Sequence, residues 1–234
     1  MFDVHCHILP GIDDGSKDVQ MSLDMLRLTA EQGVEGVIFT PHFYADMYSP
    51  EEFLNRRSKA LEELEANLSQ LSKVPKYTVG SEVHYFRGMS RYDGLESLCI
   101  GKSDYILIEM PFRDWQALFV DEIQEISRVL GLKVIIAHIE RYLDQDKRLV
   151  AKLMDDPNIL IQCNAEFFID RPTASKAIKM LKSGRVDLLG SDCHRINHRK
   201  PNLAEAVEII KKKAKPELLE HIWNTSRKIF EQAI

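Results

Sequence analysis

The sequence predicts an α/β fold built around a parallel sheet of about seven strands. Short apolar runs rich in Val, Ile and Leu alternate along the chain with longer segments whose apolar residues recur at helical spacing. Continuous apolar strands between amphipathic helices are typical of a parallel sheet that helices cover on its outer side. Such a sheet is either a barrel or an open, doubly wound sheet. We expect the barrel, in an incomplete form with seven strands.

Seven short runs are the strand candidates, and they lie at residues 2–4, 36–40, 77–83, 105–109, 133–137, 159–163 and 186–190. Helical periodicity between them is carried by Val19, Leu23, Leu26 and Ala30, by Leu61, Leu64, Leu68 and Leu71, by Phe119, Ile123, Ile126 and Leu130, and by Leu203, Val207 and Ile210. The second set belongs to a long charged helix predicted over about 51–71, whose polar side we expect to face solvent. No linker divides the chain, so one domain over residues 1–234 is predicted.

Composition narrows the classes of function. A chain of 234 residues with 44% apolar content is long enough for one domain with a sizeable core. The net charge of −5 is spread along the chain without a long basic stripe, which disfavours nucleic acid as a partner. The one basic run, Lys211 to Lys213 with Lys215, closes a helical segment, where cations interact favourably with the helix dipole.

Localisation and redox state are predicted from the same data. No apolar stretch approaches the roughly 20 residues that cross a bilayer, and the chain runs directly into Asp3, His5 and His7 instead of a signal peptide. The four cysteines contain no CxxC pair, which argues against a disulfide framework and against a zinc ribbon. We therefore expect a cytoplasmic protein with reduced thiols.

Side chains that can bind metal ions follow six of the predicted strands. They are His5 and His7, His42, Glu82 and His84, Glu109, His138, and Asp192 with His194. The carboxyl ends of parallel strands meet at one rim of the sheet, so these residues are expected to be neighbours. Imidazole and carboxylate are ligands of Mn, Fe and Zn, and several carboxylates are needed to neutralise two or more divalent ions.

The spacing within these motifs fits metal binding. Residues two apart on an extended segment point to one side, so His5 and His7 can reach one ion, and Asp192 with His194 can do the same. A bridging carboxylate can hold two ions about 3.5–4 Å apart, the separation used for in-line phosphoryl displacement. Hydrolysis at phosphorus is therefore the expected chemistry.

With these residues assembled, the chain resembles the PHP (polymerase and histidinol phosphatase) superfamily. Within it, the resemblance is to the bacterial manganese-dependent protein-tyrosine phosphatases of capsule and exopolysaccharide operons. The matching motifs are Asp3-Val4-His5-Cys6-His7-Ile8-Leu9-Pro10 with Asp13-Asp14-Gly15, Thr40-Pro41-His42, Gly80-Ser81-Glu82, Ile106-Leu107-Ile108-Glu109, Ile136-Ala137-His138-Ile139-Glu140-Arg141 and Gly190-Ser191-Asp192-Cys193-His194. They span residues 3 to 199 in the expected order.

The resemblance implies a distorted (β/α)7 TIM-like barrel, the PHP fold, with a trinuclear centre of up to three Mn²⁺ ions, Fe or Zn being the alternatives. By motif, one ion is held by His5, His7 and Asp192, a second by Glu109 and His138 with Glu82 bridging it to the first, and a third by Asp14, His42 and His194. Asp13 is a close neighbour of Asp14 that can be confused with it. Arg141 and Arg199 match the two arginines that contact the phosphate. The implied partner is an autophosphorylated bacterial tyrosine kinase.

The sequence departs from the family in two places. Ile139 stands where the family usually has Pro, which affects the local shape of the loop. After the sixth strand, Cys163, Asn164 and Glu166 have no assigned role, and packing or hydrogen bonding at the strand end is expected for them.

The expected reaction is attack of a metal-bound hydroxide on phosphorus without a phosphoenzyme, while the two arginines hold the non-bridging oxygens. Phenolate leaves with less acid assistance than an alkoxide because the pKa of tyrosine is about 10. Tyr44 and Tyr48, in the loop after His42, either stack on a phosphotyrosine ring or pack the loop. His198 is either a proton donor or a surface residue.

Three alternatives remain open. Cys193 and Arg199 have the CxxxxxR spacing of cysteine-dependent phosphatases, but no glycine lies between them, and the neighbouring Asp192 would oppose thiolate formation. The second alternative keeps the metals but takes a small phosphomonoester such as histidinol phosphate, or a nucleic-acid 3′ end. The third is a non-catalytic regulatory module of polysaccharide export, against which the full ligand set argues.

Overall fold

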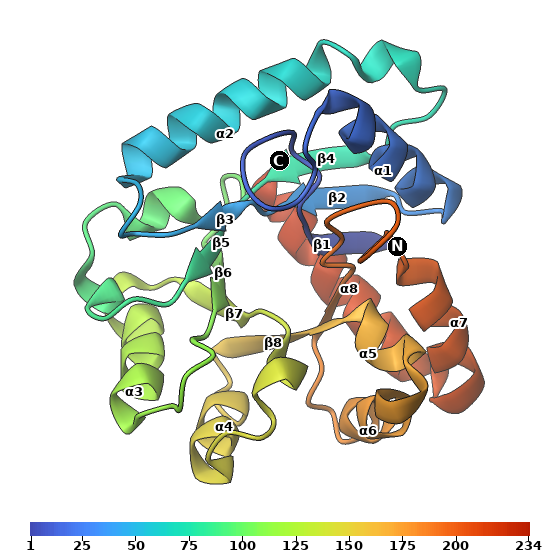
Figure 1. Cartoon of the computed structure of the whole chain (residues 1–234). Coiled ribbons are helices and arrows are strands. Elements are labelled where there is room, and N and C mark those ends of the chain that lie inside the picture. Colours follow the sequence, from blue (N-terminus) through green and yellow to red (C-terminus); the bar gives the residue numbers. More distant parts are fainter.

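The computed structural model describes residues 1–234 and contains nine β-strands and eight α-helices, interspersed along the chain (Figure 1). The strands are β1 (Phe2–Cys6), β2 (Gly36–Phe39), β3 (His42–Phe43), β4 (Lys76–Val79), β5 (Glu82–His84), β6 (Tyr105–Glu109), β7 (Lys133–Ile136), β8 (Ile159–Asn164) and β9 (Leu188–Gly190). The helices are α1 (Val19–Glu31), α2 (Pro50–Glu65), α3 (Ala117–Glu125), α4 (Lys147–Met154), α5 (Ala165–Ile169), α6 (Arg171–Lys182), α7 (Leu203–Lys213) and α8 (Pro216–Ala233). None of the helices is both long and apolar enough to cross a lipid bilayer.

The nine strands occupy seven positions of one distorted barrel. All pairs are parallel, in the orders β1-β2-β4 and β3-β5-β6-β7-β8-β9. Thr40 and Pro41 separate β2 from β3, and Gly80 and Ser81 separate β4 from β5. β4 and β5 together are the strand predicted over 77–83, with an interruption, and β3 continues the strand predicted over 36–40 beyond its predicted end. The predicted seven-stranded parallel barrel is confirmed.

The barrel closes between its first and last strands with little regular pairing. The segment just after β9 meets β1 through an isolated parallel bridge between Cys6 and Cys193. Two backbone hydrogen bonds accompany it, from Asp192 N–H to the His5 carbonyl at 2.8 Å and from His7 N–H to the Cys193 carbonyl at 2.9 Å. This closure places the HxH segment of β1 and the DxH segment after β9 side by side.

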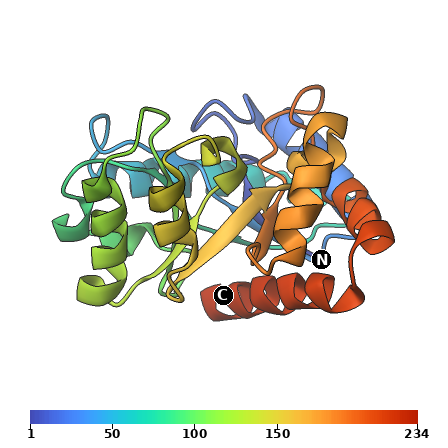
Figure 2. The same ribbon diagram turned by 90° about the horizontal axis from the view of Figure 1, so that it is seen from below.

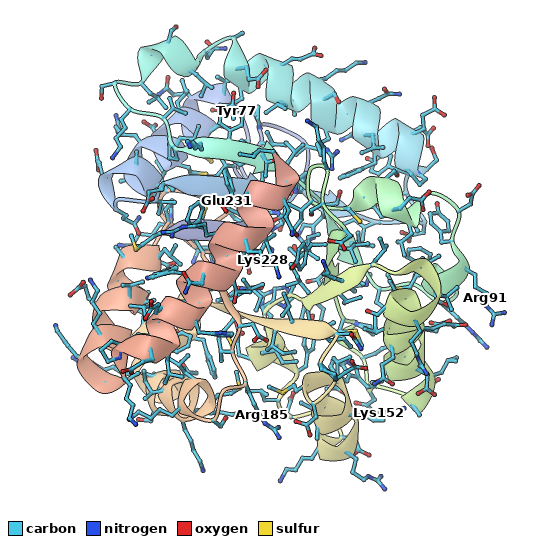
Figure 3. The ribbon with its side chains drawn as sticks, turned by 180° about the vertical axis from the view of Figure 1, so that it is seen from behind. Tyr77, Arg91, Lys152, Arg185, Lys228 and Glu231 are labelled. Carbon is cyan, nitrogen blue, oxygen red and sulfur yellow. The ribbon has the colours of Figure 1, made fainter.

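Alternate strand residues pack in different places, as the pleat requires. Leu107, Ile135 and Leu188 belong to a small cluster inside the barrel, which Ile229 and Phe230 of α8 complete. The neighbouring residues in the strands belong to a larger cluster under the surrounding helices. Figure 2 shows α8 lying across one end of the barrel, and Figure 3 shows the same helix from behind, with Lys228 and Glu231 on its outer surface. Apolar side chains therefore fill the end of the barrel that α8 covers, and the opposite end is left for polar side chains.

Local sequence explains where the long helices begin and end. α2 starts with a capping box between Ser49 and Glu52, followed by Pro50 in the first turn. It ends at Glu65, earlier than the predicted limit near Leu71, and a short 3₁₀ turn over residues 68–70 follows. Helices α4, α5 and α6 were not predicted. The first two are short, with eight and five residues, and so contain few apolar repeats.

Candidate metal centre

The predicted metal ligands come together at the end of the barrel opposite α8. Donor atoms lie within 4.8 Å of one another in three overlapping groups: His5, His7, Glu82 and Asp192; His7, Asp14, His42 and His194; and His42, Glu82 and Glu109. His138 joins them, since its Nε2 lies 2.8 Å from Glu82 Oε1 and 3.4 Å from Glu109 Oε1. All nine residues predicted from the motifs are therefore in one place, each brought by the exit of a strand except Asp14, which comes from the loop after β1.

Glu82 lies at the middle of this centre. Its Oε2 atom is 3.1 Å from His5 Nε2, 3.1 Å from His7 Nε2 and 3.1 Å from His42 Nδ1. The same oxygen is buried and has no hydrogen-bond partner, and His42 Nδ1 is also buried and unpaired. Two donors bound about 2.1 Å from one ion stand about 3 Å apart. Imidazole nitrogens that converge at this separation on a carboxylate oxygen without a hydrogen-bond partner fit a divalent metal cofactor.

Charge in the centre also favours cations. Burial by itself raises the pKa of Glu82, but the imidazoles of His5 and His42 outweigh it and hold that pKa well below its usual value. Burial likewise raises the pKa of Asp192, and His5 and His7 more than reverse the effect. Both carboxylates are therefore ionised at neutral pH, which is the state that binds metal ions.

Asp13 and Asp14 have different positions. The buried Asp13 carboxylate orients other groups: its Oδ2 lies 2.8 Å from His7 Nδ1 and accepts the His42 backbone N–H at 3.1 Å. The exposed Asp14 points to the open side of the centre, with Oδ1 3.5 Å from His42 Nε2 and 3.3 Å from His194 Nε2. The turn that follows them needs Gly15, because a Cβ there would lie 2.4 Å from the His7 carbonyl oxygen.

A chain of side-chain amides, which the motifs did not reveal, connects three strands beneath the ligands. Gln162 Oε1 accepts the His138 backbone N–H at 2.8 Å and lies 3.1 Å from His5 Nδ1. Gln162 Nε2 donates to Asn164 Oδ1 at 2.9 Å, and Asn164 Nδ2 donates to Asp192 Oδ2 at 2.7 Å. The amide oxygen only accepts, so His5 carries its proton on Nδ1 and directs the Nε2 lone pair at the centre.

Strand alternation could have identified these amides. Leu160, Gln162 and Asn164 share the inner face of β8, and the last two are polar residues buried at its carboxyl end. Cys163 points the other way, into the core, and Glu166 is exposed in the first turn of α5. These two residues are therefore not part of the centre.

Two arginines stand at the mouth of the centre. Arg141 Nη2 and Arg199 Nη2 each lie 2.5 Å from the same oxygen, Asp192 Oδ2. Both guanidinium groups are partly exposed. His138, Asp192 and Arg199 adopt left-handed backbone conformations, with φ of 33°, 50° and 53°. Such conformations are uncommon outside glycine and concentrate at functional sites.

The positions of the other histidines and of Cys193 show whether they belong to the centre. His84 Nδ1 lies 2.9 Å from Glu109 Oε2 and holds that carboxylate. His198 is exposed, and His221 pairs with Asp187 on the surface. Cys193 is fully buried in the barrel wall beside Cys6, so a thiolate nucleophile is not presented to the mouth.

Comparison with known proteins places these features in a family. Residues 1–230 match the family described as capsular polysaccharide synthesis, CpsB/CapC. The chain is 25% identical over 224 residues to the Tyrosine-protein phosphatase YwqE of Bacillus subtilis, covering 93% of this chain and 87% of that protein. It is 27% identical over 226 residues to the Tyrosine-protein phosphatase CpsB of Streptococcus pneumoniae, covering 91% of this chain and 90% of that protein.

Solved structures agree on the fold. The crystal structures of YwqE from Bacillus subtilis and CpsB from Streptococcus pneumoniae are described as those of unique metal-dependent tyrosine phosphatases, and one of their chains superposes with a TM-score of 0.84 at 23% identity, over 100% of this chain and 96% of that one. The TatD-like protein of Archaeoglobus fulgidus gives a TM-score of 0.54 at 14% identity, over 99% and 100% of the chains. Because the family match extends over almost its entire length, the chain belongs to the CpsB/CapC family of capsular polysaccharide synthesis.

Proposed function

We propose that this protein is a metal-dependent protein-tyrosine phosphatase that hydrolyses phosphotyrosine in proteins, with residues 1–234 acting as one PHP domain. The observation that carries the proposal is the unpaired, buried Glu82 Oε2, which stands 3.1 Å from each of three imidazole nitrogens. Two arginines lie at the mouth beside it. The names of the relatives as tyrosine-protein phosphatases support the same activity.

The proposed ligand sets use the same nine residues that the structure brings together. His5, His7 and Asp192 would hold one ion, Glu109 and His138 would hold a second, Glu82 would be shared by these two, and Asp14, His42 and His194 would hold a third. Mn²⁺ is the proposed metal, because a mixed set of imidazoles and carboxylates with several oxygen donors suits it, and Fe or Zn would be the substitutes. When bound, the ions supply Lewis acidity that polarises the phosphate and lowers the pKa of water toward 7.

The chain's own residues would bind and orient the phosphate. Arg141 and Arg199 donate from planar guanidinium groups, which can contact two phosphate oxygens at once. In the structure both contact Asp192 Oδ2, so this carboxylate presents the two guanidinium groups side by side. The amide chain through Gln162 keeps the Nε2 lone pair of His5 directed inward. A phenolate leaving group then needs little proton assistance.

The biological setting is proposed from the family. Capsular polysaccharide synthesis is the process in the family's description, which supports a role for the protein in capsule or exopolysaccharide synthesis. We propose an autophosphorylated bacterial tyrosine kinase as the phosphotyrosine partner and the cytoplasm as the location.

The test is hydrolysis of a phosphotyrosine peptide by metal-stripped protein, with and without Mn²⁺, for the wild type, His42→Ala and Cys193→Ser. We expect activity that requires metal, survives in Cys193→Ser and collapses in His42→Ala. Activity without metal that disappears in Cys193→Ser would replace the proposal with a thiolate mechanism. Full metal occupancy with no turnover would support a non-catalytic role instead.

A further inference from the structure

The loop that leaves β3 carries two tyrosines, and only Tyr44 lies against the metal centre. Its ring centroid is 5.4 Å from that of His42, at an interplanar angle of 29°, and 5.4 Å from that of His84, at 45°. His42 Nδ1 is in turn 3.1 Å from Glu82 Oε2. One side chain therefore separates the Tyr44 ring from the middle of the centre.

Tyr48 is held elsewhere. The guanidinium carbon of Arg56, on α2, lies 4.7 Å above the centroid of the Tyr48 ring. The Tyr48 backbone N–H also donates to the Tyr44 carbonyl at 3.1 Å, which folds the loop back on itself. Tyr48 therefore packs the loop against α2, and its ring face is already occupied by a cation.

Tyr44 and Arg141 consequently lie on different sides of the mouth. Tyr44 follows β3, and Arg141 follows β7, which is three strands away in the order β3-β5-β6-β7 and so on the far side of a seven-position barrel. Tyr44 is partly exposed, as is Arg141. A phosphate held by the arginines and by ions at the metal ligands would thus have an aromatic ring near it.

We propose that Tyr44 is a specificity-determining residue whose ring contacts the aromatic ring of the substrate, so that the site selects aryl over alkyl phosphomonoesters. This inference rests on the proposed phosphatase function and names the structural basis of its preference for phosphotyrosine. In phosphotyrosine the ring is bonded directly to the ester oxygen, so it lies in the layer next to the phosphate. Phosphoserine places only a methylene group there.

The size of the effect follows from aromatic pairing. Ring pairs with centroids 4.5–7 Å apart contribute about 0.5–1.5 kcal/mol beyond the area that they bury, which corresponds to about 2- to 13-fold in an equilibrium constant. A contact made equally in the ground state and the transition state changes KM and leaves kcat unchanged. Loss of Tyr44 should therefore weaken binding of aromatic ligands without slowing chemistry.

The competing explanation is that Tyr44 only supports His42. The two ideas differ in what Tyr44→Ala changes. A supporting role would reduce the affinity of the centre for metal, and aromatic and non-aromatic ligands would weaken by the same factor. A specificity role would leave metal content unchanged and lower the preference for the aromatic ligand.

The experiment uses Mn²⁺-loaded wild type, Tyr44→Ala, Tyr44→Phe and, as the matched control, Tyr48→Ala. Metal content is measured first. Dissociation constants are then determined by calorimetry for phenylphosphonate and cyclohexylphosphonate, which carry six-carbon rings with and without aromatic character, and kcat and KM are measured for a phosphotyrosine peptide.

We expect Tyr44→Ala to keep its metal, to lose about 2- to 13-fold of the preference for phenylphosphonate, and to raise KM for the peptide by a similar factor. Tyr44→Phe and Tyr48→Ala should behave as the wild type. An unchanged ratio of the two dissociation constants in Tyr44→Ala, or metal loss in that variant, would overturn the inference while the phosphatase function stands. Absence of wild-type turnover on the peptide would overturn both.

Discussion

Replacing Gln162 by leucine tests whether the buried amide chain controls the metal centre. The substitution keeps the size of the side chain but removes the acceptor for His5 Nδ1–H and for the His138 backbone N–H, and the donor to Asn164 Oδ1. Three buried polar groups lose their partner. Each such loss costs about 1–3 kcal/mol, so the free energy of unfolding of the metal-free protein should fall by at least about 3 kcal/mol. For a chain of this size, that is about 6–12 °C in Tm.

The same variant should bind metal more weakly. Hydrogen bonds that orient metal-bound histidines are worth about 10- to 100-fold in affinity, and Gln162 fixes the proton position of His5. We expect a loss of that order for the tightest ion, measured by competition with a fluorescent chelator, with the same number of ions bound at saturation. Gln70→Leu, the same change at an exposed position, is the control. Metal affinity within about twofold of the wild type in Gln162→Leu would refute the reasoning.

Three further outcomes are expected. Removing the metal with a chelator should lower the free energy of unfolding by about 2.7 kcal/mol for each ion lost, relative to protein in free metal at 100 times the Kd of that ion, and calorimetry should show a lower Tm. In the metal-free protein, burial lowers the pKa of His138, but Glu109 and Glu82 raise it by more, to about 9. The contribution of His138 to stability is therefore complete below about pH 6.5 and disappears as the pH rises through 9. Thermal melts of metal-free wild type should therefore decline over that window, and His138→Gln should show a smaller decline. Arg57 Nη1 donates to the Gly80 carbonyl at 2.7 Å and to Ser81 Oγ at 3.1 Å. Arg57→Met should therefore lower the free energy of unfolding in urea by about 1.5–3 kcal/mol. A loss under about 0.5 kcal/mol would contradict a role for Arg57 in stabilising the interruption between β4 and β5.

Much of the fold could be predicted because its signals are local. Each inner strand shows a short apolar run, and each run ends in a residue such as Glu109 or His138 that lies at the rim when parallel strands assemble. The interruptions of the second and third strands were not predicted, although Pro41 removes a backbone donor at one of them. Strand pairing is set by partners far along the chain, and a single sequence does not contain that information.

The details of the site depended on contacts between distant segments. Whether Asp13 or Asp14 faces the centre depends on the turn at Gly15, which is fixed by the His7 backbone. Whether Tyr44 or Tyr48 faces the mouth depends on Arg56, which comes from another element. The role of Gln162 depends on β7 and β1 lying on either side of it in space. In each case the sequence shows the type of the residue but not the direction in which its side chain points.

The seam between β1 and β9 has a consequence for biosynthesis. Strand β1 leaves the ribosome before β9 and α8, but the bridge from Cys6 to Cys193 and the apolar contact with α8 both depend on these later segments. Closing so long a loop is slow, because its entropy must be lost before the contacts form. A nascent chain therefore exposes His5 and His7 long before Asp192 exists. The complete donor set around Glu82 therefore forms only after the segment that carries Asp192 and His194 has been translated, and His5 and His7 have no such partners before then.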